Sequence, residues 1–547
     1  MTEPRLTLNS VSYALPNGRQ LFSDLCCTFG AQHTALVGRN GVGKSVLARI
    51  LAGQIAPTSG SITTSGLLHY LPQNPLAATP HASVAALAGM ETALQALMRI
   101  EQGSSEARDF ELLAERWDIR QQFQTLLAQI GLPALQPQTP ASQLSGGQAM
   151  RVALAGARLS AADFLILDEP SNHLDAISRA ALARDLQQWR GGLLLISHDK
   201  VLLKHMQVIA EMSPSAITVY GGSYAFYEQA QRQQSQNAQD ELARLKLERS
   251  RTEQALRNQQ ERQSRRQARG DRIGKSGNQA KILLDANKER AQSSGGKLAT
   301  QHAAKREALN QDVREAAQAL HRQVDWQAGS IHWHLPQGLN ARADRIVAEL
   351  RDVQLPYTPP HKPLNLALRA DQRVAICGPN GCGKSTLLQV LAGQLLAPSG
   401  QRLMHGSFAL LDQGQSLLQP QLSVLKQLQA ASPRTPESLQ RMRLAQLGLD
   451  ARHIDQPNAL LSGGERLKAA MACALYADED EQSALPILLL DEPDNHLDLP
   501  SQQALQALLV QYPGPLVVVS HDEALLQAIH LTHRLDWAGD EWLWMEV

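Results

Sequence analysis

The chain has 547 residues, of which 43% are apolar and 19% charged, and its formal net charge is zero. This composition is typical of a globular protein, and the length predicts several folding units, because single hydrophobic cores stop growing near about 250 to 300 residues. No apolar stretch approaches the roughly 20 residues that cross a bilayer, and residues 1–10 carry no targeting pattern, so we expect a soluble, cytoplasmic protein without a membrane span. The five cysteines show no C-x-x-C spacing, so we expect neither a zinc site nor a disulfide framework.

In chain order, the first recognisable element is an apolar strand at 34–37, followed by a glycine-rich segment that opens an apolar helical pattern. The segment reads Gly38-Arg39-Asn40-Gly41-Val42-Gly43-Lys44-Ser45, with Val46 next. Glycines in such a loop let backbone N–H groups and a helix N-terminus converge on phosphates. Lys44 is placed to reach these phosphates, and the Ser45 hydroxyl is placed to bind Mg²⁺. The segment therefore predicts a phosphate-binding loop that holds ATP and Mg²⁺.

Further along, polar residues follow two apolar runs typical of buried strands. Asp168 ends the first run and is placed to bind Mg²⁺, directly or through water. The next residue, Glu169, is placed to orient or deprotonate the attacking water, an effect of about 10²- to 10⁴-fold by general-base precedent. His198 follows the second run, and we interpret it as a γ-phosphate contact. Its Ser-His-Asp context is not a serine-hydrolase triad, because adjacent strand residues point to opposite faces.

Residues 227 to about 330 read as charged helix with almost no aromatic residues. Two weak apolar seams step by four and three residues and predict two antiparallel helices: Ala238, Leu242, Leu245, Arg249, Thr252 and Leu256, then Leu309, Val313, Ala316 and Leu320. Five glycines are expected to break the helices around a short helix at 279–291, at a basic tip: Gly270, Gly274, Gly277, Gly295 and Gly296. Residues 231–330 hold 20 Lys and Arg against 12 Asp and Glu, a net charge of +8. This basic linker fits phosphate contacts, and a solvated spacer is the alternative.

The second half repeats every motif of the first in the same order. The repeated loop reads Gly378-Pro379-Asn380-Gly381-Cys382-Gly383-Lys384-Ser385, with Thr386 next. Asp491 repeats the Mg²⁺ ligand, Glu492 the residue that activates water, and His521 the γ-phosphate contact, while Ser385 repeats the Mg²⁺-binding hydroxyl. Strand segments that alternate with helical ones in both halves predict an α/β fold with mostly parallel sheets and a phosphate loop at a strand's carboxyl end.

Together these motifs resemble the ATP-binding cassette superfamily, and the resemblance covers both halves. It implies two P-loop cassettes that close on each other within one chain, which we expect to be a monomer, with the signature of each cassette capping the ATP of the other. The signature residues are Ser145, Gly146, Gly147 and Gln148 opposite Lys384, and Ser462, Gly463, Gly464 and Glu465 opposite Lys44. Gln73 and Gln413 resemble the glutamine loops that sense Mg²⁺ and the γ-phosphate. Tyr13 lies where the family often stacks an aromatic ring on adenine, and an ordinary strand aromatic is the alternative.

Two fused cassettes, no membrane span and a helical hairpin linker resemble the ABC-F family of translation-associated ATPases. Asn172-His173-Leu174-Asp175 and Asn495-His496-Leu497-Asp498 match that family's Asn-His-Leu-Asp, although the family usually has Thr in place of Ser171 and Asp494. The resemblance implies a first cassette over 1–226 with a short arm-like insertion at about 77–138, a linker over 227–342, and a second cassette over 343–547. It further implies that the linker tip contacts ribosomal RNA or tRNA, and that the protein modulates translation or protects it from an antibiotic.

The sequence leaves two alternative functions open. One is the ATP-binding component of a membrane transporter, which would need separate membrane subunits and gives no reason for the basic linker. The other is a DNA-associated ATPase. Excision-repair relatives carry zinc-binding cysteines that this chain lacks, and chromosome-maintenance relatives have far longer coiled coils.

Overall fold

The computed structural model describes most of the chain as two compact units. Residues 228–327 form one unit, and residues 1–227 together with 328–547 form the other. The described residues are 4–73, 75–78, 82–113, 116–160, 162–172, 174–276, 304, 306–316, 344–358, 361–412, 417–476, 485–495 and 497–547.

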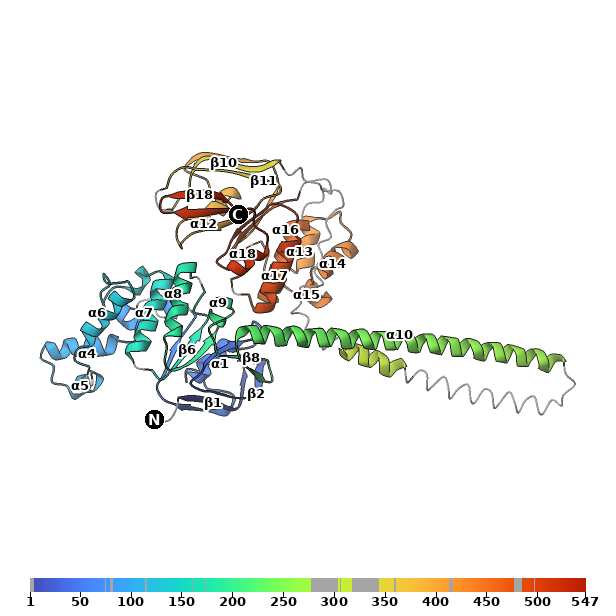
Figure 1. The fold of residues 1–547 in the computed structure, drawn as a ribbon, viewed down its shortest axis with the longest axis horizontal. Coiled ribbons are helices and arrows are strands. Elements are labelled where there is room, and N and C mark those ends of the chain that lie inside the picture. Colours follow the sequence, from blue (N-terminus) through green and yellow to red (C-terminus); the bar gives the residue numbers. More distant parts are fainter. Residues whose placement is uncertain are drawn as a thin grey trace. The chain divides into compact units, whose positions relative to one another are not determined.

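Within these residues, the first cassette is built on a six-stranded sheet in the order β5-β6-β7-β3-β8-β9, parallel except for β9 (Figure 1). A second, antiparallel sheet has the order β2-β1-β4. The strands are β1 (Arg5–Ala14), β2 (Gln20–Phe29), β3 (His33–Val37), β4 (Ser59–Ser65), β5 (Leu68–Leu71), β6 (Phe164–Asp168), β7 (Gly192–Ile196), β8 (Val208–Met212) and β9 (Ile217–Gly221).

The second cassette repeats this plan. Its main sheet has the order β14-β15-β16-β12-β17-β18, with β18 antiparallel, and its smaller antiparallel sheet has the order β11-β10-β13. The strands are β10 (Ile346–Gln354), β11 (Leu364–Arg369), β12 (Arg373–Cys377), β13 (Ser399–Met404), β14 (Phe408–Leu411), β15 (Ile487–Asp491), β16 (Leu516–Val519), β17 (His533–Ala538) and β18 (Glu541–Glu546). The predicted α/β fold with mostly parallel sheets is confirmed in both halves.

Helices connect the strands and cover the sheets. In the first cassette they are α1 (Lys44–Leu51), α2 (Pro75–Ala78), α3 (Val84–Leu87), α4 (Glu91–Glu101), α5 (Ala107–Leu113), α6 (Ile119–Gln129), α7 (Gly146–Leu159), α8 (Ala176–Gln187) and α9 (Lys200–Leu203). In the second they are α12 (Lys384–Leu391), α13 (Val424–Ala431), α14 (Glu437–Gln446), α15 (Ala451–Asp455), α16 (Gly463–Tyr476), α17 (Leu499–Gln511) and α18 (Glu523–Ala528). Helices α3 to α6 fall within the expected insertion at 77–138 and contribute buried residues to the core of the first cassette.

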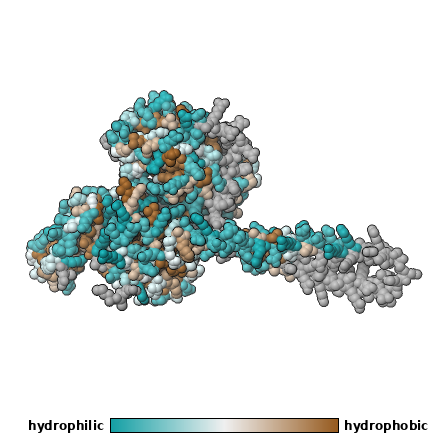
Figure 2. All heavy atoms as spheres, viewed as in Figure 1, coloured by the Kyte–Doolittle hydropathy of each residue, from teal (hydrophilic) through white to brown (hydrophobic). Residues whose placement is uncertain are grey.

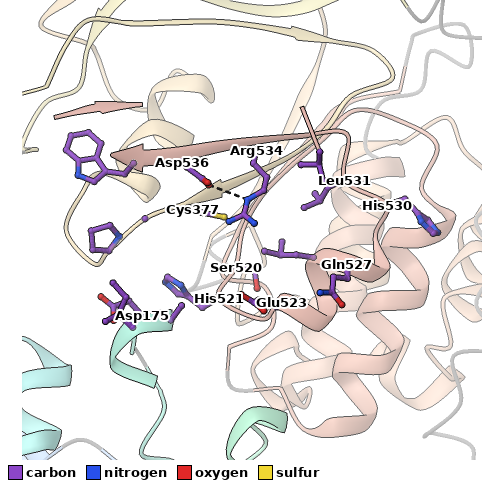
Figure 3. Close-up of a pocket in the computed structure, with 17 residues that line it drawn as sticks. Asp175, Cys377, Ser520, His521, Glu523, Gln527, His530, Leu531, Arg534 and Asp536 are labelled. Atoms are coloured by element: carbon purple, nitrogen blue, oxygen red, sulfur yellow. Dashed lines mark hydrogen bonds and ion pairs between the residues drawn. The ribbon is translucent and has the colours of Figure 1, made fainter. Parts of the chain in front are cut away.

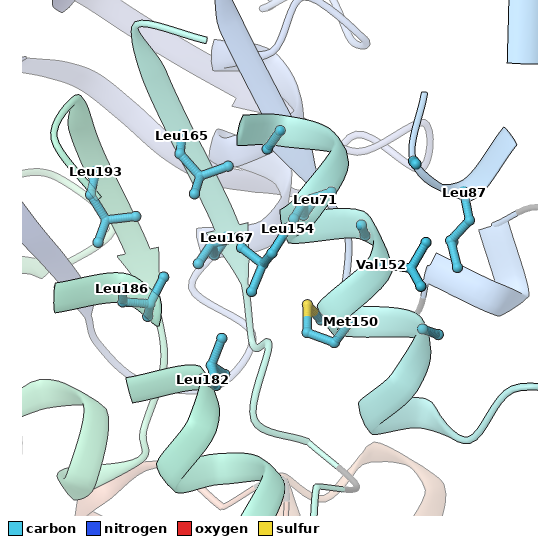
Figure 4. Close-up of a cluster of buried hydrophobic side chains, with 14 of the residues drawn as sticks. Leu71, Leu87, Met150, Val152, Leu154, Leu165, Leu167, Leu182, Leu186 and Leu193 are labelled. Atoms are coloured by element: carbon cyan, nitrogen blue, oxygen red, sulfur yellow. The ribbon is translucent and has the colours of Figure 1, made fainter. Parts of the chain in front are cut away.

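Alternating side chains on the central strands fill two cores, one on each face of the sheet. Leu165 and Leu167 of β6 join the cluster that contains α7 and α8 (Figure 4). Phe164 and Ile166 join the cluster on the opposite face, which contains α1 and the antiparallel sheet. A parallel strand covered on both faces needs an unbroken apolar run, because successive side chains point to opposite sides. These runs therefore fix the strand ends at which Asp168 and Asp491 lie.

The described part of the linker unit is helical. Helix α10 (Tyr224–Ser276) has 53 residues, and residues 306–316 are also helical. Leu242, Leu309 and Val313 are each only 8% exposed, as the predicted apolar seams require. Figure 2 shows an otherwise hydrophilic surface along α10. Among the described residues, no helix combines the length and the apolar character needed to cross a membrane.

The expected break at the first two linker glycines is wrong. Gly270 and Gly274 both lie inside α10, which ends at Ser276. Glycine in a helix interior costs only about 1 kcal/mol relative to alanine, and the surrounding Arg, Gln and Lys residues are good helix formers. The other three glycines and the predicted helix at 279–291 lie outside the described residues.

Candidate active site

Each phosphate loop joins a central strand to a helix through left-handed glycines. Gly41 and Gly43 have φ of 80° and 105° between β3 and α1, and Gly381 and Gly383 have φ of 82° and 103° between β12 and α12. Residues with a Cβ rarely adopt this conformation. The loop is therefore shaped by its glycines, which turn backbone N–H groups toward one point at the helix N-terminus.

The two loop lysines fold back over their own loops. Lys44 Nζ donates to the carbonyl oxygens of Gly38 at 2.7 Å and Arg39 at 3.1 Å. Lys384 Nζ makes the same pair of contacts, with Gly378 at 2.9 Å and Pro379 at 3.1 Å. Burial lowers the pKa of the Lys44 amine, although nearby carboxylates oppose this shift. An anionic phosphate at this point would therefore compensate a buried positive charge.

A carboxylate and a hydroxyl meet at the end of β6. The Ser45 hydroxyl donates to Asp168 Oδ1 at 3.0 Å, and the Tyr70 hydroxyl approaches Asp168 Oδ2 at 3.4 Å. In the second cassette, Asp491 Oδ1 is buried without a hydrogen-bond partner among the described residues. Burial raises the pKa of both aspartates, because a carboxylate removed from water loses the hydration that stabilises its charged form. Clustered oxygens of this kind are the ligands that Mg²⁺ prefers, so the residues present fit this ion.

The glutamates that follow these aspartates have strained backbones. Glu169 has φ of 46° and Glu492 has φ of 48°, in the left-handed region that non-glycine residues rarely occupy. The Glu169 N–H donates to the carbonyl oxygen of Ile196, and the Glu492 N–H to that of Val519, each at 2.8 Å. Both acceptors are the last residues of the neighbouring strands. Strain of this sort persists only where surrounding structure enforces it, often at functional sites. Burial raises the pKa of the Glu169 carboxyl to about 8, and the nearby Lys44 charge opposes this shift.

The predicted histidines lie next to these glutamates. His198 Nε2 is 3.7 Å from Glu169 Oε1, and His521 Nε2 is 3.8 Å from Glu492 Oε1. Burial lowers the pKa of His198 to about 3 and of His521 to about 4, so both rings are neutral at pH 7 and these contacts are not ion pairs. Both ring nitrogens of His198 and Nε2 of His521 are buried without a hydrogen-bond partner among the described residues. Unsatisfied buried nitrogens at this position fit a phosphate oxygen as their missing partner.

These groups surround a cavity of about 420 Å³ in the first cassette. Its lining brings together Asn40, Gly41, Gly43, Lys44, Ser45, Val46, Gln73, Glu169 and His198, all predicted from the sequence, with Leu21, Asn172 and Ile196, which were not. Asn172 belongs to the repeated Asn-His-Leu-Asp segment, and this repetition was the signal that marked it. Gln413, the counterpart of Gln73, lies outside the described residues.

Two groups predicted to contact the nucleotide from outside the phosphate loop, Tyr13 and the signature of the second cassette, do not line this cavity within the described residues. The Tyr13 ring lies 6.2 Å from the Phe22 ring, centroid to centroid, and Tyr13 is not among the described residues that line the cavity. In the second cassette, Leu355 stands at the position equivalent to Tyr13 and is buried, and Tyr357, two residues further on, is 93% exposed. The signature residues Ser462 to Glu465 are also absent from the described lining. Adenine stacking by Tyr13 and capping by the opposite signature stay predictions.

The signature segments are helix N-termini held by their own side chains. Ser145 caps α7, and the Gln148 side chain accepts from the Ser145 N–H in return, a complete capping box. Ser462 and Glu465 make the same exchange at α16, and Glu465 Oε1 also lies 3.2 Å from His453 Nε2. The capping boxes fix the orientation of both signature turns.

The two cassettes contact each other through Asp175 and Asp498, whose role the sequence did not reveal. One oxygen of Asp498 caps α17 through the Ser501 N–H at 3.1 Å, and the other accepts from the Asn40 N–H of the opposite phosphate loop at 3.0 Å. Asp175 caps α8 in the same way and reaches the Asn380 N–H at 3.5 Å. Each of these aspartates thus ties a helix of one cassette to the phosphate loop of the other.

A separate cavity of about 740 Å³ lies beside the second phosphate loop (Figure 3). Its lining includes Asp175, Cys377, His521 and Arg534, and the figure shows the Arg534 side chain paired with Asp536. Lys384, Ser385 and Glu492 are not among the described residues that line it. Gly378 and Pro379 of the second phosphate loop do line it, together with His521, so this cavity adjoins the predicted second site.

A family model described as "ABC transporter" matches residues 27–172 and 361–495. The chain is 29% identical over 527 residues to the "Probable ATP-binding protein YheS" of Escherichia coli K12, covering 92% of this chain and 74% of that protein. It is 29% identical to the "Tylosin resistance ATP-binding protein TlrC" of Streptomyces fradiae, covering 96% and 93%, and 28% identical to the "Energy-dependent translational throttle protein EttA" of Mycobacterium tuberculosis, covering 93% and 88%.

Among solved structures, the chain resembles the archaeal ribosome recycling factor aABCE1, which was crystallised in complex with the ribosomal stalk protein aP1. The TM-score is 0.57 at 17% sequence identity, covering 98% of this chain and 90% of the other. At this identity the similarity concerns the fold alone. Both comparisons agree with the duplicated architecture described above.

Proposed function

We propose that this chain, which belongs to the ATP-binding cassette family, is a ribosome-associated ATPase that converts ATP binding into a ribosome-bound state. Its cassettes bind ATP and hydrolyse it to ADP and phosphate, and its relatives confirm the resemblance to the ABC-F family. Ribosome association, an effect on translation or antibiotic protection, and a cytoplasmic location are parts of the proposal.

The geometry supports a direct route for hydrolysis. Ser45 and Asp168, with Gln73, would hold Mg²⁺ in the first site, and the bound ion would neutralise charge on the β- and γ-phosphates. Lys44 and the loop N–H groups bind the phosphates. Glu169 accepts a proton from the attacking water, and the neutral His198 ring donates a hydrogen bond to a γ-phosphate oxygen. Ser385, Asp491, Glu492 and His521 would serve the second site in the same roles.

The linker is the observation that carries the ribosome proposal. Residues 242–281 hold 12 Lys and Arg but only four acidic residues. In the described helix, Arg244 is 71% exposed and Arg265 is 83% exposed. A net positive charge on a helical unit outside the cassettes fits the phosphates of a nucleic acid, and the near absence of aromatic residues does not favour base stacking. The relatives named for translational throttling and tylosin resistance support the same assignment.

A sedimentation experiment tests the class of partner. We expect the full chain with Glu169→Gln and Glu492→Gln to pellet with ribosomes in ATP, because the cassettes would bind ATP and remain closed without hydrolysis. The same protein in ADP, and a version that also carries Lys44→Ala and Lys384→Ala, should remain in the supernatant. Parallel tubes with membrane vesicles or DNA provide the alternatives. If the protein pellets in ATP with membrane vesicles or with DNA, and not with ribosomes, the ribosome is not its partner and the proposal is wrong.

A further inference from the structure

A buried charged cluster between the cassettes breaks the symmetry of the duplication. The segments 168–199 and 491–522 have equal length, so each residue of one has a counterpart in the other. Arg179 on α8 has Gln502 on α17 as its counterpart, and Ser171 has Asp494. These two differences between the repeats place an arginine in the first cassette and an additional carboxylate in the second.

Arg179 reaches from its own cassette to the Ser520-His521-Asp522 segment of the other. Its Nε lies 3.1 Å from Asp199 Oδ2, and its NH1 donates to the backbone carbonyl oxygen of His521 at 3.3 Å. The Arg179 side chain is 13% exposed and that of Asp199 is 7% exposed, so the pair is largely shielded from water. Asp199 uses its other oxygen to cap α9 through the Val201 N–H at 2.8 Å. The guanidinium is therefore held from behind by a fixed carboxylate and presented to His521.

Among the described residues, no equivalent contact runs from Gln502 of the second cassette to the carbonyl oxygen of His198 in the first. Gln502, the counterpart of Arg179, has a buried Oε1 without a hydrogen-bond partner there. Asp494 is buried, and burial together with the neighbouring Asp522 raises its pKa to about 6, a shift that the Arg179 charge opposes. These groups line one small cavity of about 50 Å³ together with Glu169 and His198 of the first site. The cluster thus borders the first ATP site through Glu169 and His198, and it reaches the second site through the hydrogen bond from Arg179 to the His521 carbonyl oxygen.

We propose that Arg179 is a positioning residue that fixes His521 from the opposite cassette, so that recognition of the γ-phosphate at the second site depends on the first cassette. The hydrogen bond to the His521 carbonyl restrains the backbone that carries the ring, whose buried Nε2 is free for a phosphate oxygen. Arginine suits this role because its planar guanidinium stays charged and contacts two acceptors at once, which a lysine amine cannot do in the same geometry. The proposal concerns ATP binding alone and is independent of any ribosome contact.

Nucleotide binding to the full chain with Glu169→Gln and Glu492→Gln tests this role, because hydrolysis does not intervene. With Mg²⁺ present, we expect Arg179→Lys to weaken ATP binding at one of the two sites by about 10- to 100-fold, the scale of one lost hydrogen bond to a charged phosphate, and to leave ADP affinity within about 2-fold. Lysine keeps the charge next to Asp199, so the protein should fold. Gln502→Ala is the matched control and should leave both affinities unchanged.

Combination with histidine variants separates positioning from a general loss of structure. If Arg179 acts through His521, Arg179→Lys should have no further effect on ATP affinity in a His521→Ala background, and its full effect in a His198→Ala background. Equal effects in the two backgrounds, or equal losses of ATP and ADP affinity, would show that Arg179 only stabilises the fold. An unchanged ATP affinity in Arg179→Lys would also overturn the proposal.

Discussion

The contact between Asp498 and Asn40 gives a prediction whose size follows from the structure. Asp498 caps α17 with one oxygen and holds the first phosphate loop with the other. Asp498→Ala removes both functions. A lost N-cap costs about 1 kcal/mol and a lost hydrogen bond to a charged group about 1.5 to 3 kcal/mol, so we expect the unfolding free energy to fall by about 2.5 to 4 kcal/mol.

Asp498→Asn separates the two functions. Asparagine is as good an N-cap as aspartate, but its amide has one oxygen, so either the Ser501 or the Asn40 N–H loses its acceptor. We expect a loss of about 1 to 2 kcal/mol and a raised KM for ATP at the first site. Asp175→Asn should cost less, because its contact with Asn380 is longer, at 3.5 Å against 3.0 Å.

The same contact has a defined pH dependence. Burial alone would raise the pKa of Asp498, but the hydrogen bonds from Ser501 and Asn40 lower it below its usual value. A carboxylate with a lowered folded-state pKa adds stability above its unfolded pKa of about 4, and this stability is lost as the pH falls through the folded value. Urea unfolding between pH 3 and pH 7 should therefore show the parent and Asp498→Asn converging at the acid end. A constant difference across this range, or equal stability at pH 7, would refute the reasoning.

Three further predictions concern the loops and turns. Lys44→Ala and Lys384→Ala should each lower steady-state ATPase activity, because closure couples both sites, and a variant with full turnover would mark its site as structural. Glu169→Gly should abolish turnover while raising the unfolding free energy by up to about 1 kcal/mol relative to Glu169→Ala, because glycine relieves the left-handed φ; a less stable glycine variant would contradict the strain. Gly464→Ala should destabilise the chain by about 1 to 3 kcal/mol, since its Cβ would lie 2.2 Å from Ser501 Oγ, and Gly146→Ala, with open space at its Cβ, should cost less than about 0.5 kcal/mol in the same unfolding assay.

The repeated motifs made much of the fold and the core of each site predictable. Apolar runs before Asp168 and Asp491 specify buried parallel strands, and a buried strand has one edge at which a polar side chain can emerge. The phosphate loop is equally local, because its shape depends on glycines within eight residues. Both features depend only on residues that are close together in the sequence, so the sequence alone predicts them.

Contacts between distant segments could not be read in this way. The sequence marked Asp498 as part of a repeated segment, but its bond to Asn40 depends on how two cassettes meet. The same holds for Arg179 and His521, which are far apart along the chain. In the linker, Gly270 and Gly274 do not end the helix, because the low helix propensity of a single glycine is outweighed by the long run of good helix formers around it.

The salt dependence of ribosome binding tests the central claim most directly. Arg265, Arg266, Arg269 and Arg272 all lie in α10, whereas Lys281 of the predicted tip lies outside the described residues. Each phosphate contact adds about 0.7 to 0.9 to the slope of log affinity against log salt, so changing these four arginines to Gln should flatten the slope by about three and leave ATP affinity unchanged. The same affinity and slope as the parent would show that the linker is a spacer and would contradict a ribosome contact through its phosphate-binding charge.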